Sequence, residues 1–264
     1  MGFYATSFSY DNVPSETYNL SIASIDDSGG VVGNGSGDVT IIEQFVFGRT
    51  VPYFFGVQYD NKLTFPVSFY SQTEITALDA SLIQYWLFGN QQYKKLSIIQ
   101  QDMDQVYFNC IFTEPETIRF GNKIYGFSAN CVCDSPFAWQ YPKTVEYLFA
   151  GMFTNDTVTF YNDNHYKGYL YPELTIYMPP KGRTFQIVNA SDNDRMFEFE
   201  DLTGGDVIHV NNDLCILTAN SGDLLLPKFN KNFFRLVPGL NTLHVYGHID
   251  KLNITYQYAR RLGG

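Results

Sequence analysis

The segment GFSANCVCDSPFAW, Gly126 to Trp139, alternates apolar and polar residues and then stops at a proline. Its apolar side chains are two residues apart, so on a strand they all point to one face. They are Phe127, Ala129, Cys131 and Cys133. The Asp-Ser-Pro that follows ends the strand, because proline cannot donate to the hydrogen-bond ladder. The segment therefore predicts a half-buried strand that closes a domain.

Cys131 and Cys133 leave three interpretations open: half of a metal site, a redox pair, or two small core residues. Zinc sites favour Cys pairs spaced by two with a second ligand pair, and the other cysteines, Cys110 and Cys215, stand alone. A reactive thiol needs an exposed, electropositive setting, which this apolar row lacks. The pattern favours the core, and we predict no metal or cofactor. So few cysteines do not make a disulfide scaffold, which indicates synthesis in a reducing cytoplasm.

Upstream, KLTFPVSFYS at 62–71 alternates with period two and predicts another strand. The next segment, SQTEITALDASLIQYWLFGN at 71–90, changes to helical spacing. Its apolar positions are Ile75, Leu78, Leu82, Tyr85 and Trp86. Ser71 and Glu74 form a capping-box pattern, and Gly89 is a C-terminal stop. We expect one helix that covers a sheet face with this apolar stripe.

The glycine-rich segment Asp26–Val39 precedes a strand-like segment. It lacks the Lys-Ser/Thr of a phosphate-binding loop, and no helix pattern follows it. We therefore predict an extended hairpin or arm for contact between subunits. Its central residues are Gly29, Gly30, Val31, Val32, Gly33, Asn34 and Gly35.

Downstream of Trp139 a new set of short alternating segments begins, separated by turn signals such as that at 203–206. This spacing is typical of an antiparallel sandwich. The predicted fold class is mainly β, with two β-sandwich-like domains. The first, residues 1–138, holds the helix and the arm, and the second spans residues 139–264.

Composition narrows the function. The chain has 264 residues, of which 45% are hydrophobic and 17% aromatic, and its formal net charge is −10. Aromatic residues favour strands, and an acidic chain without a basic run argues against nucleic-acid binding. No apolar run approaches the roughly 18 residues of a membrane span, so we predict no membrane insertion. The first twenty residues lack the basic and apolar regions of a signal peptide.

No catalytic pattern is present. The chain has no HExxH and no G-x-S-x-G. His244 and His248 fall on a strand-like segment, where residues four apart lie roughly 13 Å from each other, too far to share one ion. We predict that the protein is not an enzyme and that it acts in binding or assembly. One alternative is a carbohydrate-binding module, in which Tyr166, Tyr169 and Tyr171 form a platform for sugar rings.

The order of these motifs resembles the distal tail (Dit) protein family of siphophages. The resemblance is carried by SFSYDNVPSETYNLSIASID near the N-terminus, GRTVPYFFG, KLTFPVSFY, the helix segment, the hairpin that ends in SPFAW, and FFRLVPGLNTLHVYG near the C-terminus. It covers nearly the whole chain.

The resemblance implies a specific assembly. The first domain would form a homo-hexameric ring, closed by β-arms, around a channel through which DNA passes without specific binding. The second domain would be a galectin-like sandwich on the outside. One ring face would meet the major tail tube protein and the other the tail-associated hub protein, with receptor-binding or side baseplate proteins at the periphery. The protein would lie at the distal end of the virion tail, after assembly in the bacterial host cytoplasm.

Overall fold

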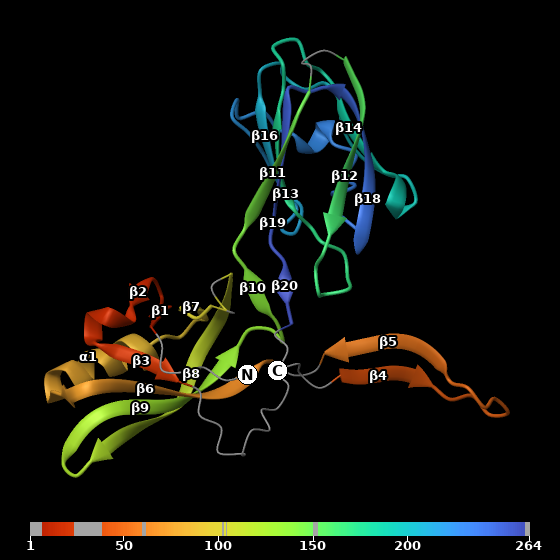
Figure 1. The fold of residues 1–264 in the computed structure, drawn as a ribbon. Coiled ribbons are helices and arrows are strands. Elements are labelled where there is room, and N and C mark those ends of the chain that lie inside the picture. The colour runs from red at the N-terminus through yellow and green to blue at the C-terminus, as the bar shows by residue number, and fades with distance from the viewer. Residues whose placement is uncertain are drawn as a thin grey trace. The chain divides into compact units, whose positions relative to one another are not determined.

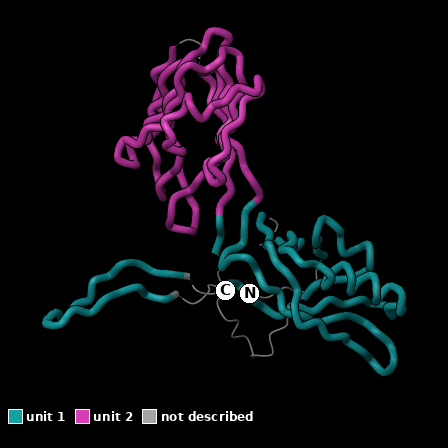
Figure 2. Tube along the Cα trace, turned by 180° about the vertical axis from the view of Figure 1, so that it is seen from behind, with its two compact units in different colours: residues 1–140, 259–264 teal, residues 141–258 magenta. Residues whose placement is uncertain are grey.

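The computed structural model describes residues 7–23, 39–59, 62–101, 103, 105–149 and 153–261 (Figure 1). The chain divides into two compact units (Figure 2). Unit 1 contains residues 1–140 and 259–264, and unit 2 contains residues 141–258. A mainly β fold with one α-helix among the described residues confirms the predicted fold class. The domain limits at 138 and 139 stay a prediction.

Unit 1 is built on an antiparallel sheet of nine strands in the order β2-β1-β7-β8-β9-β6-β3, extended from β8 by β10 and β20. The strands are β1 (Phe8–Tyr10), β2 (Val13–Pro14), β3 (Leu20–Ala23), β6 (Thr64–Ile75), β7 (Lys94–Ile98), β8 (Val106–Phe120), β9 (Lys123–Cys133), β10 (Ala138–Gln140) and β20 (Ala259–Arg260). A 3-10 turn, η1 (Ser15–Tyr18), joins β2 to β3. The C-terminal strand β20 thus returns to unit 1 and pairs with the strand that leaves it.

The helix α1 runs from Ala77 to Phe88. It starts later than the capping-box pattern predicts, because β6 continues to Ile75. Thr76 is the N-cap, and its Oγ1 accepts a hydrogen bond from the Asp79 N–H at 3.2 Å. Gly89 ends the helix as expected, with its N–H bonded to the Tyr85 carbonyl.

The apolar stripe predicted for α1 is buried only in part, because Ile75 and Trp86 are 6% and 9% exposed whereas its other members face outward. The residues packed into the core are Ala80, Ile83, Trp86 and Leu87. Leu78, Leu82 and Tyr85, expected to face the sheet, are 72%, 46% and 80% exposed. Both sides of this helix are apolar, so the spacing alone could not say which side meets the sheet.

A separate two-stranded sheet consists of β4 (Val39–Gln44) and β5 (Tyr53–Tyr59). The two strands are antiparallel, with Ile41 opposite Val57 and a bulge near Ile42. Neither strand pairs with any other strand of the described chain (Figure 1).

Unit 2 is a sandwich of two antiparallel sheets, with strand orders β11-β19-β13-β16-β17 and β12-β18-β14-β15. The strands are β11 (Lys143–Leu148), β12 (Phe153–Asn162), β13 (Glu173–Tyr177), β14 (Phe185–Asn189), β15 (Arg195–Phe199), β16 (Val207–Asn211), β17 (Ile216–Ala219), β18 (Gly239–His248) and β19 (Lys251–Tyr256), with the 3-10 turns η2 (Ala190–Asp192) and η3 (Leu226–Lys228). The core lies between the sheets, where Ile187 and Val245 of one and Ile176 and Ile254 of the other are fully buried.

The turn at 203–206 does not form the hairpin that the sequence suggests. The strands on either side of it, β15 and β16, belong to opposite sheets of unit 2. The turn therefore carries the chain across the sandwich. No helix among the described residues is long and apolar enough to cross a membrane.

Candidate functional site

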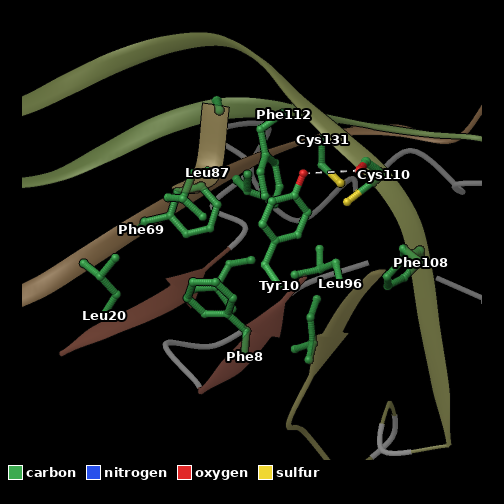
Figure 3. Packing of buried hydrophobic residues seen from close by; sticks show 14 of the residues in the cluster. Phe8, Tyr10, Leu20, Phe69, Leu87, Leu96, Phe108, Cys110, Phe112 and Cys131 are labelled. Carbon is green, nitrogen blue, oxygen red and sulfur yellow. Dashed lines mark hydrogen bonds between the residues drawn. The ribbon is translucent and has the colours of Figure 1, made fainter. Parts of the chain in front are cut away.

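Cys131 and Cys133 both belong to the core of unit 1. Figure 3 shows Cys131 in this core, next to Cys110. Cys131 and Cys133 are fully buried on β9, and Cys110 of the neighbouring strand is opposite Cys133. Burial away from water raises the pKa of the Cys131 thiol well above its usual value and also raises that of Cys110. Buried thiols with raised pKa values are poor nucleophiles, and the core interpretation is confirmed. Within the described residues, no group of three or more His, Cys, Asp or Glu side chains could hold a metal ion.

Tyr10 links this core to the helix. Its hydroxyl donates to the Cys110 carbonyl at 3.4 Å, drawn as a dashed line in Figure 3. The indole N–H of Trp86 donates to the Tyr10 carbonyl at 3.0 Å, so α1 is tied to β1. Burial raises the pKa of the Tyr10 phenol, which therefore stays protonated. These bonds hold α1 with Trp86 inward, as predicted, and Tyr85 outward.

The hairpin β4–β5 exposes apolar side chains on both faces. Ten large apolar residues between 41 and 57 are each at least 43% exposed: Ile41, Ile42, Phe45, Val46, Phe47, Val51, Tyr53, Phe54, Phe55 and Val57. Phe47, in the turn, is fully exposed. An exposed apolar surface of this kind is typical of sites that contact another macromolecule. We call it the hairpin surface.

The predicted arm residues Gly29 to Gly35 lie outside the described residues, so their role stays a prediction. What the structure describes is a hairpin that begins at Val39 and turns between Gln44 and Tyr53. The sequence signal for this hairpin was the run of aromatic and β-branched residues from 39 to 59, rather than the glycines before it.

Unit 1 has a second exposed apolar surface on α1. Leu78, Leu82 and Tyr85 are spaced by four and three residues, so they form one stripe along the helix. We call it the α1 stripe. The hairpin surface and the α1 stripe belong to different elements of unit 1.

The structure brings two of the three predicted platform tyrosines together. Tyr169 and Tyr171 meet edge to face, with ring centroids 6.4 Å apart and planes at 64°. The ring of Tyr166 lies against the backbone of Gly168, so closely that any side chain at position 168 would clash with it. All three are at least 40% exposed, but Tyr169 and Tyr171 do not form a flat stacking surface. Their role in glycan binding stays a prediction.

A cavity of about 300 Å³ opens beside these tyrosines in unit 2. It is lined by Tyr171, Arg195, Asn212, Asp213, Cys215, Lys231, Phe233 and Arg235, which we call the basic pocket. Its three cations come from β15 and from the segment before β18. Sequence reasoning missed the pocket because these residues form no local motif; the only signal was KNFFR at 231–235, where two cations flank aromatic residues.

Comparison with known proteins places the chain in a family. Residues 3–135 match the family model of a phage tail protein N-terminal domain, and residues 137–256 match that of a phage tail C-terminal domain. The chain therefore belongs to this family of phage tail proteins. No curated protein sequence matches it.

Solved structures share the fold. The chain aligns with the crystal structure of the Dit protein of phage SPP1 at a TM-score of 0.69 and 10% identity, over 97% of this chain and 100% of that one. The SPP1 protein is described as a paradigm of the hub adsorption apparatus of phages that infect Gram-positive bacteria. A chain of the phage P2 baseplate, in its activated conformation with Ca, aligns at a TM-score of 0.50 and 10% identity, over 96% of this chain and 98% of that one. The predicted resemblance to the Dit fold is confirmed over nearly the whole chain.

Proposed function

We propose that this protein is the structural hub ring at the distal end of a phage tail. Six copies would surround the channel through which DNA passes and would join the major tail tube protein to the tail-associated hub protein. Membership of the phage tail family and the Dit-like fold support this role. The role requires no catalysis.

The observation that carries the proposal is the hairpin surface. A two-stranded hairpin is at best marginally stable in water, and this one pairs with no other strand of the described chain. Fully burying one side chain such as Ile41 or Phe54 gives roughly 1.5–3 kcal/mol. Contact with a neighbouring copy would bury several of them, so assembly supplies the stability that the hairpin lacks.

The α1 stripe offers the complementary surface. A contact between two different surfaces of the same chain is heterologous, and such contacts form closed rings when the rotation between copies fits. We infer that the hairpin surface of one copy packs against the α1 stripe of the next. Each copy would then donate one apolar surface and accept another, which leaves neither exposed in the ring.

The net charge of the protein is consistent with a channel for DNA. With a net charge of −10, the protein repels DNA at long range, which suits a channel that DNA must cross without sticking. The protein would lie in the virion at the tail tip after assembly in the bacterial host cytoplasm. Receptor-binding or side baseplate proteins would bind at its periphery.

Mass photometry and sedimentation of the full chain over a wide concentration range test the ring. We expect hexamers to replace monomers as concentration rises, with ring-shaped particles in negative stain. Ile41→Thr removes apolar contact from the hairpin and keeps its β-branched character. If the substitution costs roughly 1.4 kcal/mol in the free energy of association, the association constant of each subunit contact falls about tenfold.

The matched control is Ile216→Thr, because Ile216 is also an exposed strand residue, at 49%, but belongs to unit 2. It should assemble like the wild type. A chain that stays monomeric at every concentration contradicts the ring. Equal assembly of the Ile41 variant and the wild type contradicts the role of the hairpin surface.

A further inference from the structure

One side of the basic pocket of unit 2 is held in place by the hydrogen bonds of a buried side chain. Asn212 is 2% exposed, and its side-chain amide donates to the Pro172 carbonyl at 2.6 Å. The amide oxygen accepts the Phe234 N–H at 2.8 Å. Asn212 thus holds the turn after β16 against two other segments. Asp213 and Cys215, which follow it in this turn, line the cavity from a fixed backbone.

Arg235 is held in place on a second wall. Its Nε and Nη2 donate to the two carboxylate oxygens of Asp192 at 2.7 and 3.1 Å, and the Asp192 side chain is only 3% exposed. The guanidinium also lies over the Tyr169 ring, 3.8 Å from its centroid. The hydrogen bonds to Asp192 raise the pKa of Arg235. Such a bidentate, stacked arginine is preorganised as well as charged.

The other two cations have no carboxylate partner in the described chain. Arg195 donates only to the Phe233 carbonyl, from Nε and Nη2 at 3.4 Å each. Lys231 makes no hydrogen bond or ion pair with any described residue. Its backbone has φ of +65°, in the left-handed region that lysine seldom adopts. A strained backbone that places an unpaired cation at a cavity is typical of a binding site.

The charge of the pocket opposes that of the protein. Among the described residues, three cations and one carboxylate, that of Asp213, line it. Asp192 offsets Arg235, so Arg195 and Lys231 outweigh Asp213 by one charge. The whole chain has a net charge of −10. A locally positive cavity on an acidic protein concentrates anions at that point.

The rest of the lining suits a sugar. Tyr171 and Phe233 supply aromatic rings, and Asp213 supplies a carboxylate that can accept hydrogen bonds from hydroxyls. At about 300 Å³, the cavity is at the small end of the range for ligand sites, roughly 300–1,000 Å³. We propose that the basic pocket binds one anionic saccharide unit, a sugar with a phosphate or carboxylate group, whose anion pairs with Arg195 and Lys231.

This inference goes beyond the hub role and does not depend on it. The pocket lies entirely within unit 2, whereas the hairpin surface and the α1 stripe belong to unit 1. Monomeric protein that binds the sugar would refute the ring and keep the pocket. A hexameric ring that does not bind the sugar would refute the pocket and keep the ring.

Titration of the full chain with glucose 1-phosphate, glucuronate, glucose and inorganic phosphate tests the proposal, by calorimetry or by NMR of the ligand. We expect saturable binding of one or both anionic sugars, which identifies the anion. Glucose and inorganic phosphate should each bind at least about tenfold more weakly, because each lacks one half of the recognition.

Two variants assign the site. Lys231→Asn removes the charge but keeps a residue that tolerates the left-handed backbone, and Arg195→Gln removes the other free cation. Each should weaken binding about tenfold. Lys181→Asn is the matched control, because Lys181 is also an exposed lysine of unit 2 that makes no ion pair with a described residue but lies outside the lining. Thermal unfolding reports whether each variant is folded.

The proposal is overturned if neither anionic sugar binds. It is also overturned if inorganic phosphate binds as tightly as glucose 1-phosphate, which defines a plain anion site. Folded Lys231 and Arg195 variants that bind like the wild type, or like the Lys181 variant, would place the sugar elsewhere.

Discussion

Asn241 is the residue whose replacement should damage unit 2 most clearly. It is fully buried in the LVPGLN segment at 236–241, at the start of β18. Its amide nitrogen donates to the Val237 carbonyl at 2.8 Å and to the Gly239 carbonyl at 3.0 Å. Its amide oxygen accepts the Val237 N–H and the Asn189 side-chain amide, both at 2.9 Å. One side chain therefore closes the turn and links it to β14.

Asn241→Ala removes all four hydrogen bonds. A typical bond contributes about 0.5–1.5 kcal/mol net, and a buried polar group left unpaired costs about 1–3 kcal/mol. Val237 and Gly239 are half-buried, so water can hydrate some of the backbone groups that the substitution leaves unpaired. The Asn189 amide keeps a second acceptor, the Arg235 carbonyl at 3.2 Å. We therefore expect a loss of about 3 kcal/mol in the free energy of unfolding of unit 2.

Differential scanning calorimetry measures this loss. Unit 2 spans Tyr141 to Tyr258. For a unit of that size, 1 kcal/mol corresponds to roughly 4 °C, so its transition should fall by about 12 °C. Leu240→Ala is the control, since Leu240 is the neighbouring residue but is 58% exposed, and it should stay within about 0.5 kcal/mol. A loss under about 1 kcal/mol for the Asn241 variant would refute the argument that the amide holds the turn.

Three further predictions concern other contacts. A thiol reagent should modify the exposed Cys215 rapidly and the three buried cysteines of unit 1 only on unfolding; mass spectrometry of the native protein showing more than one label would contradict their burial. Asp192→Ala breaks the pair with Arg235, which is partly exposed and can be rehydrated, so unit 2 should lose about 2–3 kcal/mol in thermal unfolding; an unchanged transition would show that the pair contributes nothing. Trp86→Phe removes the indole bond to the Tyr10 carbonyl and should cost unit 1 about 1–2 kcal/mol in urea unfolding, whereas a neutral result would mean that ring packing alone holds α1.

The strands were the most predictable part of the fold. Period-two alternation placed Cys131 and Cys133 in the core, because a strand leaves only two faces and the other residues of that row are apolar. The sheet to which each strand belongs was harder to predict. The turn at 203–206 looks like a hairpin turn, yet it connects the two sheets, since a turn's residues do not record which strand will pair with the next.

The basic pocket could not be predicted for a related reason. Arg195 belongs to β15, whereas Lys231 and Arg235 lie in the segment before β18. The sandwich brings them together in space, and no spacing in the sequence encodes that distance. Tyr169 and Tyr171 meet because they are neighbours in the sequence, whereas the arginine stacked on Tyr169 is brought there by the tertiary fold.

The apolar patterns of α1 and of the hairpin do not reveal which of their faces the rest of the chain covers. Pattern reasoning assumes that apolar residues face the chain's own core, and α1 violates this assumption because both of its sides are apolar and only one can meet the sheet. The hairpin violates it as well, since neither of its faces is covered by the described chain. Natural sequences break local rules mainly at functional sites. The apolar residues that the fold leaves outside are therefore the ones that we expect a neighbouring copy to cover.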